Sequence, residues 1–301
     1  MTLALDGHGL APVTDMAGAS LPDRWARHPV VVAEHAYHGW DASHAWWDDE
    51  AFLVRLRWRE RTDGARPFAV EADGTGASLL GVGTPGAAAR LLLRARDELR
   101  SSGDAMGVRR ASLPRGTHAA LSVLTPGGVG APAPFDRAPG GAWDWFGTTV
   151  APGEQPGQDR VTELVGPGSG DEVARALATA NPHGELSPHE PRARWWGWRG
   201  DDGVLRGVAG ASRRVPGQPW VLGSIGTDPA WRGRGIAAAV TAAATRAGLE
   251  EVAMVTLGMY AHNDAARRVY ARLGFTLAQR FESWRPTRAA RPAPSGRASA
   301  R

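Results

Sequence analysis

The feature that most constrains the fold is a glycine- and arginine-rich segment between an expected strand and an expected helix. Residues 231–237 read WRGRGIA, with the apolar run WVLGSIGT before them at 220–227 and an alanine-rich run after them. Glycine permits close approach to the backbone, and the first turn of a helix offers unpaired N–H groups and the positive end of its dipole. The junction therefore predicts a cradle for a phosphate or pyrophosphate, with Arg232 and Arg234 at its rim. The alternative is a tight turn with solvated arginines.

A second segment, AHNDAARRVYARLGF at 261–275, has the features of a short capped helix. Asn263 or Asp264 can cap its start, and Gly274 can end it in a left-handed conformation. Helical spacing places Asn263 and Tyr270 on one stripe, which forms a polar edge on an otherwise packed helix. Taken alone, the segment is also compatible with an ordinary surface helix that carries a half-buried tyrosine.

Together, the two segments resemble the GCN5-related N-acetyltransferase (GNAT) superfamily over residues 158–286. The family signature Q/R-x-x-G-x-G/A is matched by Arg232, Gly235 and Ala237, and the helix with asparagine, tyrosine and a terminal L-G-F is matched by the second segment. Within the superfamily, residues 220–286 look like the C-terminal (FR47-like) domains grouped with glycine N-acyltransferase.

This resemblance implies an N-acetyltransferase that moves an acyl group from acetyl-CoA, or another acyl-CoA, directly to a primary amine of a small molecule. It implies that Tyr270 is the general acid for the leaving thiolate, and a phenol with a pKa of about 10 does hold a proton at neutral pH. It needs no metal. The resemblance also implies a set of donor-binding residues: Ile225, Thr227, Arg232, Gly233, Arg234, Gly235, Ile236, Ala237 and Asn263.

One departure from the family pattern concerns the general base. Many family members carry a glutamate on the strand before the phosphate loop, whereas WVLGSIGT has no acid, and Ser224 can position a water but is a poor base. Candidates from elsewhere are Glu185, His189 and Glu190 in the loop HGELSPHEP, and an already neutral amine needs no base. The missing acid leaves an alternative function open, a non-catalytic acyl-CoA-binding sensor or assembly module.

The length of 301 residues favours two domains. A similar succession of strand, helix, hairpin and helix in the two halves indicates an internal duplication. The expected fold class is mixed α/β, with two GNAT-like domains in tandem and the first one degenerate. The expected organisation is a loose segment at 1–28, the degenerate domain at 29–150, a linker at 151–159, the acyltransferase domain at 160–286 and a disordered Arg/Pro/Ala tail at 287–301.

Within the first half, the sequence predicts a strand at 28–36 and a helix at 44–61, where apolar residues recur at spacings of three and four. The segment GVGTPG at 81–86 matches the pattern G-x-G-x-x-G. Pro85 removes an amide donor there, and no acid follows at the end of a second strand. These departures favour a degenerate copy of the phosphate loop, or a plain turn, over a nucleotide site.

Charge and composition narrow the remaining classes of function. All 35 basic residues are arginines, which explains a sequence pI of 10.4 at a net charge of only +4. They are spread among 31 acids, so nucleic-acid binding is not expected. The absence of cysteine excludes disulfides and thiolate chemistry, and irregular histidine spacing at 34–44 does not favour a metal site. WWGW at 195–198 predicts a packed strand or an aromatic wall for the acceptor.

Localisation and assembly follow from weaker signals. The sequence has no apolar run of about 20 residues and no basic start followed by an apolar core. We therefore expect a cytoplasmic monomer or homodimer that does not associate with membranes, and the sequence leaves the identity of the amine acceptor open.

Overall fold

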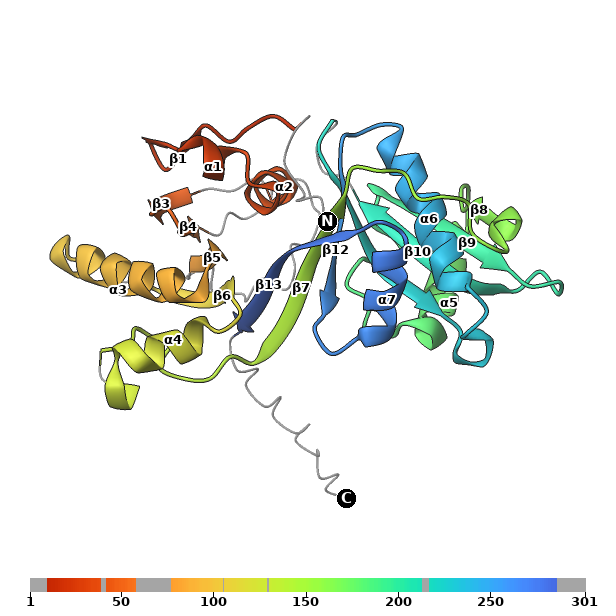
Figure 1. The fold of residues 1–301 in the computed structure, drawn as a ribbon. Coiled ribbons are helices and arrows are strands. Elements are labelled where there is room, and N and C mark those ends of the chain that lie inside the picture. Colours follow the sequence, from red (N-terminus) through yellow and green to blue (C-terminus); the bar gives the residue numbers. More distant parts are fainter. Residues whose placement is uncertain are drawn as a thin grey trace, which may run out of the picture.

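The computed structural model describes residues 10–38, 42–57, 77–104, 106–128, 130–212 and 217–285. Within these residues, eleven strands form one sheet in the order β3-β4-β5-β6-β13-β7-β12-β11-β10-β9-β8. Figure 1 shows the N-terminal half, coloured red to yellow, on one side of the long central strands β7 and β13, and the C-terminal half on the other. The predicted mixed α/β class is confirmed.

The elements of the N-terminal half precede residue 149. They are β1 (Asp15–Met16), β2 (Ala19–Ser20), α1 (Asp23–Ala26), α2 (Pro29–His38), β3 (Ala42–Trp47), β4 (Ala51–Arg57), β5 (Ala77–Gly83), α3 (Pro85–Ser101), β6 (Val108–Pro114), α4 (Thr117–Leu124), η1 (Pro126–Gly128) and β7 (Gly141–Thr148).

The elements of the C-terminal half begin at residue 158. They are η2 (Gln158–Arg160), β8 (Val161–Glu163), α5 (Ser169–Ala180), β9 (Ala193–Arg199), β10 (Leu205–Ser212), β11 (Trp220–Thr227), η3 (Pro229–Trp231), α6 (Ile236–Leu249), β12 (Val255–Tyr260), α7 (Asp264–Arg272) and β13 (Thr276–Trp284). Among these elements, β11 and α7 lie in the segments 220–227 and 261–275, for which the sequence predicts a strand and a capped helix, and α6 follows the glycine- and arginine-rich segment as expected.

The sheet repeats one pattern from each edge toward its centre. Strands β3, β4 and β5 are antiparallel, and β5 then runs parallel to β6 after the crossover helix α3. Strands β9, β10, β11 and β12 repeat this order with the crossover helix α6. At the centre, β13 pairs with β6 and β7, and β7 pairs with β12. Each half therefore contributes its last strand to the part of the sheet formed by the other half.

Helices cover both faces of the sheet. In the N-terminal half, α3 and α4 pack in one apolar cluster, and α1 and α2 pack in another on the opposite face. In the C-terminal half, α6 and α7 share a cluster with β11 and β12, whereas α5 packs against the other face of β9 and β10. In the described part of the chain, no helix has the length and apolar character to cross a membrane.

Two secondary-structure predictions for the N-terminal half are wrong. Residues 28–36, predicted as a strand, lie largely in helix α2, where Val30 to Ala33 are all buried, so the helix shows no amphipathic period. Of residues 44–61, predicted as a helix, residues 44–57 are described, and they belong to the hairpin of β3 and β4. Its turn is closed by Asp48, whose Oδ1 accepts hydrogen bonds from the backbone N–H groups of Glu50 at 2.7 Å and Ala51 at 2.8 Å.

The expected loose segment at 1–28 is also corrected for residues 10–28. Leu10, Val13, Met16 and Trp25 are buried in the cluster that contains α2. The segment therefore forms part of the core, because its few apolar side chains are spaced to meet one face of the sheet. The predicted tail at 287–301 lies outside the described residues.

Candidate active site

The site opens where the pairing of two parallel strands ends. Strand β11 pairs with β12 only between Trp220–Leu222 and Val255–Leu257, although β11 continues to Thr227 and β12 to Tyr260. A register shift against β10 marks a bulge in β11 at the same point, and Ser224 there has a positive φ of 49°. The unpaired ends of the two strands border a cavity of about 1470 Å³.

Ser224 uses its hydroxyl to fix the bulge. The side chain is buried, and its Oγ accepts a hydrogen bond from the N–H of Leu186 at 2.8 Å and donates one to the carbonyl oxygen of Leu186 at 3.1 Å. The hydroxyl therefore ties the loop after α5 to the strand. This arrangement does not support the expectation that Ser224 positions a water.

Residues 228–235 connect β11 to α6 and form the glycine loop. The loop starts in a turn capped by Asp228, whose Oδ1 accepts a hydrogen bond from Ala230 N–H at 3.0 Å. Gly233 and Gly235 have φ values of 78° and 80°, which favour glycine. Gly235 is the N-cap of α6 and brings no capping side chain, so the first-turn N–H groups of the helix remain available to an anion.

The two arginines of the loop differ in their surroundings. Arg232 is exposed at the cavity, and its Nε lies 3.4 Å from the carbonyl oxygen of Thr227 as a donor. The guanidinium of Arg234 lies 4.6 Å from the ring centroid of Trp231, and Arg234 is absent from the cavity lining. Arg232 is therefore the arginine of this loop that faces the cavity.

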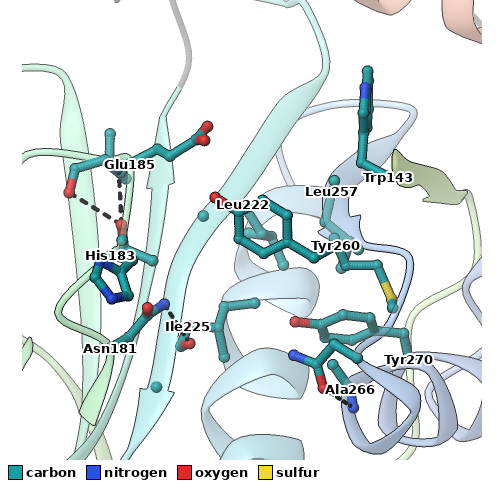
Figure 2. Close-up of a pocket in the computed structure, with 18 of the residues that line it drawn as sticks. Trp143, Asn181, His183, Glu185, Leu222, Ile225, Leu257, Tyr260, Ala266 and Tyr270 are labelled. Atoms are coloured by element: carbon teal, nitrogen blue, oxygen red, sulfur yellow. Dashed lines mark hydrogen bonds between the residues drawn. The ribbon is translucent and has the colours of Figure 1, made fainter. Parts of the chain in front are cut away.

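Helix α7 forms the opposite wall. Asn263 is its N-cap, and its Oδ1 accepts a hydrogen bond from Ala266 N–H at 3.1 Å, which confirms the predicted cap. Tyr270 is 7% exposed, and no described residue hydrogen-bonds its hydroxyl. Burial raises the pKa of Tyr270 to about 12. Figure 2 shows this hydroxyl pointing away from α7, toward the side of the cavity where Ile225 lies.

The structure brings the sequence-predicted residues together at one cavity, with Arg234 as the exception. The residues that line it are Ile225, Thr227, Arg232, Gly233, Gly235, Ile236, Ala237, Asn263 and Tyr270. The sequence analysis missed Asn181, whose Nδ2 donates a hydrogen bond to the carbonyl oxygen of Ile225 at 3.0 Å. The Ile225 carbonyl is thus already bound from within the chain.

The N-terminal half lines the far part of the same cavity. Glu34 comes from α2, Ser112 from β6, and Trp143 and Trp145 come from β7. The indole Nε1 of Trp145 donates a hydrogen bond to Oε1 of Glu34 at 2.8 Å, which fixes this carboxylate at the wall. Sequence reasoning could not find Glu34, because α2 and β7 meet the cavity only through the fold.

The candidate bases fall in different places. Glu185 lines the cavity, and its carboxylate lies 3.8 Å from the guanidinium of Arg285. His189 and Glu190 are absent from the lining, and His189 lies 3.7 Å from Asp171. His183, in the same loop, does line the cavity and was missed. Among the described residues, Glu34 and Glu185 are the carboxylates of the cavity wall.

The equivalent junction in the N-terminal half is closed. Only Thr84 separates β5 from α3, and its Oγ1 accepts a hydrogen bond from Ala87 N–H at 3.4 Å. Gly83 has a φ of 104°, and a Cβ there would lie 2.1 Å from the carbonyl oxygen of Glu50. With Pro85 in its first turn, α3 has no cradle at its start. The G-x-G-x-x-G pattern therefore marks a tight strand–helix turn.

Two other sequence features have simple structural explanations. Trp195, Trp196 and Trp198 are buried in apolar clusters on the two faces of β9, so WWGW packs the core and is not an aromatic wall. In the described ranges, no group of three His, Cys, Asp or Glu side chains is arranged to hold a metal ion.

Part of the chain matches a known family. Residues 170–275 match the family model described as Acetyltransferase (GNAT) family, so this part of the chain carries a GNAT domain. A search of curated proteins finds no match.

Solved structures with similarity to the chain include three acetyltransferase-type proteins. A GCN5-related N-acetyltransferase from Kribbella flavida is 17% identical, with 80% of this chain and 88% of that chain covered and a TM-score of 0.44. A GNAT-family acetyltransferase from Colwellia psychrerythraea is 14% identical, with 92% of each chain covered and a TM-score of 0.45. A tandem GNAT protein from the clavulanic acid biosynthesis pathway is 15% identical, with 79% and 84% covered and a TM-score of 0.41.

Proposed function

Because residues 170–275 carry a GNAT domain, we propose that the chain is an acyl-CoA-dependent N-acetyltransferase. It transfers an acyl group from acetyl-CoA, or another acyl-CoA, to a primary amine of a small molecule. The observation that carries this proposal is the cavity at the β11–β12 gap. One cavity is lined by both a helix N-terminus without a capping side chain and the largely buried Tyr270.

The donor side is the C-terminal half. The pyrophosphate of the acyl-CoA binds the N–H groups between Gly233 and Ala237 at the start of α6, where the helix dipole favours an anion. Arg232 adds charge at the rim. The pantetheine arm lies along β11 where its pairing with β12 has ended, as an added strand. Asn263 contacts this arm through Nδ2, because its Oδ1 is used to cap α7.

The reaction is a direct transfer. The amine nitrogen attacks the thioester carbonyl carbon, and a backbone N–H of the β11 bulge stabilises the oxyanion of the tetrahedral intermediate. The carbon–sulfur bond then breaks, and Tyr270 gives its proton to the leaving thiolate. Its raised pKa keeps the phenol protonated at neutral pH, so the acid is ready before the step.

The acceptor side lies between the two halves. Glu34 and Trp143 come from the N-terminal half, and Glu185 comes from the loop after α5. A cationic amine is attracted by the two carboxylates, and one of them, directly or through water, takes a proton from it before attack, so that the nitrogen gains its lone pair. The second proton, which the nitrogen loses after attack, replaces the one that Tyr270 gives to the thiolate. The N-terminal half is thus a degenerate domain of the same type, which completes the sheet and one wall of the acceptor cavity.

The proposal is tested on the full chain in two steps. Thermal shift with acetyl-CoA and longer acyl-CoAs should show stabilisation, of about 2.7 kcal/mol at 100 times Kd. A panel of amines is then followed by CoA release with a thiol reagent, which has no background because the protein has no cysteine. Amine-dependent release supports the proposal. A thermal shift without release from any amine would favour the sensor function, and no shift would contradict the donor site.

A further inference from the structure

A buried carboxylate lies at the centre of the sheet, where the two halves exchange strands. Asp144 belongs to β7 and stands opposite Met259 of β12 and Arg280 of β13. Its side chain is 0% exposed. Two arginines bind it, because Arg115 Nη2 donates to Oδ1 and Arg267 Nη1 donates to Oδ2. Both oxygens of the buried acid are therefore satisfied, one from each half of the molecule.

Arg267 lies on the helix that carries Tyr270. Its Nη2 also donates to the carbonyl oxygen of Ala261 at 2.6 Å, and its backbone N–H donates to the carbonyl oxygen of Asn263 at 3.1 Å. The hydrogen bond that Arg267 donates to Asp144 is the largest cause that raises the pKa of Arg267. A single guanidinium thus links the central strand β7 to the residues that start α7.

The position of α7 depends on few contacts. The helix spans only Asp264–Arg272, and Tyr270 is its one buried residue. Asn263, Arg267 and Tyr270 are spaced by four and three residues, so they lie on one stripe of the helix that faces the cavity and the sheet. The ion pair between Arg267 and Asp144 lies between Asn263 and Tyr270 on this stripe. There it fixes both the position of α7 along its axis and its rotation about that axis.

We propose that Asp144 is a positioning residue for acyl transfer, which acts through Arg267 to hold the Tyr270 hydroxyl in place. This inference rests on the proposed function. It gives the N-terminal half an indirect part in the chemistry, because β7, the strand that it contributes to the C-terminal half, carries the carboxylate that holds Arg267 of α7.

Asp144, Arg115 and Arg267 form a charged triad, and its two arginines provide a matched pair of variants. Their side chains are 33% and 30% exposed, and each binds one oxygen of the same carboxylate. Arg115 otherwise donates to backbone carbonyls of the central strands, such as that of Trp143 at 3.1 Å, and its described hydrogen bonds do not include α7. Arg115→Gln and Arg267→Gln therefore remove similar interactions from Asp144, but only the second releases the helix.

The experiment measures kcat, KM for acetyl-CoA and unfolding by urea for the full chain and both variants. Arg267→Gln should lower kcat by about 10- to 100-fold, as a small misplacement of a catalytic group does, with KM for acetyl-CoA changed by less than about 3-fold. Arg115→Gln should lose similar stability and keep kcat within about 3-fold of the wild type. Asp144→Asn, which leaves α7 unaltered in sequence, should reproduce the fall in kcat.

Several results would overturn the inference. Equal kcat in the two arginine variants at equal stability would show that the triad only holds the fold, and so would loss of folding in both Arg267→Gln and Asp144→Asn. If the wild-type chain releases no CoA with any amine, the proposed function fails first. Turnover by the wild type with unchanged kcat in Arg267→Gln would contradict this inference alone.

Discussion

The two halves of the molecule differ most at the junction where a strand runs into a crossover helix. In the C-terminal half, residues 228–235 separate β11 from α6 and leave the helix N-terminus without a capping side chain. In the N-terminal half, Thr84 alone makes the connection and uses its hydroxyl to cap α3. The strand order is the same, so the ability to bind an anion depends on the loop and is not a property of the shared topology.

The gap beside each junction shows the same contrast. Beyond Leu222, β11 and β12 border a cavity. Beyond Leu80, β5 and β6 also lose their pairing, but Leu113 is fully buried there, and a Cβ on Gly81 would lie 3.0 Å from its Cδ2. Helix α4, THAALSVL, carries no tyrosine. The two halves thus share a strand order, but in the N-terminal half side chains fill the space beside the junction.

The largest effect is expected in the C-terminal half, where the cavity is open. Tyr270→Phe should lower kcat by about 10²- to 10⁴-fold, as loss of a general acid does, and should keep the thermal shift by acetyl-CoA. The measurement is steady-state CoA release with the best amine. Tyr260→Phe, at the half-exposed tyrosine of the same cavity, should act mainly on KM for the amine. Full turnover by Tyr270→Phe would exclude its role as the acid.

A second substitution removes a side chain that fills the equivalent space in the N-terminal half. Leu113→Ala should destabilise the protein by about 2–5 kcal/mol, because it leaves a cavity among well-packed residues, as measured by urea unfolding. It should not change the stoichiometry of acetyl-CoA binding, since α3 has no loop to hold a pyrophosphate. A second bound acetyl-CoA in this variant would show that side chains alone distinguish the two halves.

The two halves should also lose stability at opposite ends of the pH scale. Burial lowers the pKa of His28, in the N-terminal core, to about 4, so the unfolded chain binds a proton first and stability falls as pH drops from 6.5 toward 4, by about 3 kcal/mol. Burial raises the pKa of Tyr270 to about 12, so its contribution is lost as pH rises from about 10 to 12.

Urea unfolding across pH checks this contrast. In His28→Leu, the free energy of unfolding should fall less at acid pH and should fall as in the wild type at alkaline pH. Tyr270→Phe should show the reverse. If His28→Leu loses as much stability at acid pH as the wild type does, other groups cause this loss.

The sequence predicted the C-terminal half well because its elements carry strong local signals. Helix α7 ends at the left-handed Gly274, helix α6 begins at the left-handed Gly235, and the strands of this half alternate or run apolar between clear turns. In the N-terminal half, Val30 to Ala33 of α2 are all buried. The sequence of this helix therefore contains an apolar run, rich in β-branched residues, that is typical of a strand. In the β3–β4 hairpin, apolar residues recur at the spacing of a helix, and the turn at Asp48 is the feature that contradicts a helix.

The site was predictable where it is local and not where it depends on the fold. The glycine loop, Asn263 and Tyr270 lie within two short motifs, and the structure gathers them at one cavity. Glu34 and Asp144 could not be found, because nothing in the sequence of α2 or β7 indicates that the N-terminal half inserts a strand between β12 and β13. Long-range strand exchange leaves no periodic signal.

The most direct test of the account is acetyl-CoA binding by titration calorimetry, with one glycine changed in each half. Gly235 has a φ of 80°, and Gly86 lies within the first turn of α3 without a positive φ. The wild type and Gly86→Ala should bind one acetyl-CoA per chain with the same affinity. Gly235→Ala should bind about 10-fold more weakly, because the free loop relaxes away from a left-handed conformation that costs a residue with a Cβ about 1–2 kcal/mol, and binding of the anion has to restore it. Equal affinity of Gly235→Ala and the wild type, or weaker binding by Gly86→Ala alone, would contradict the account.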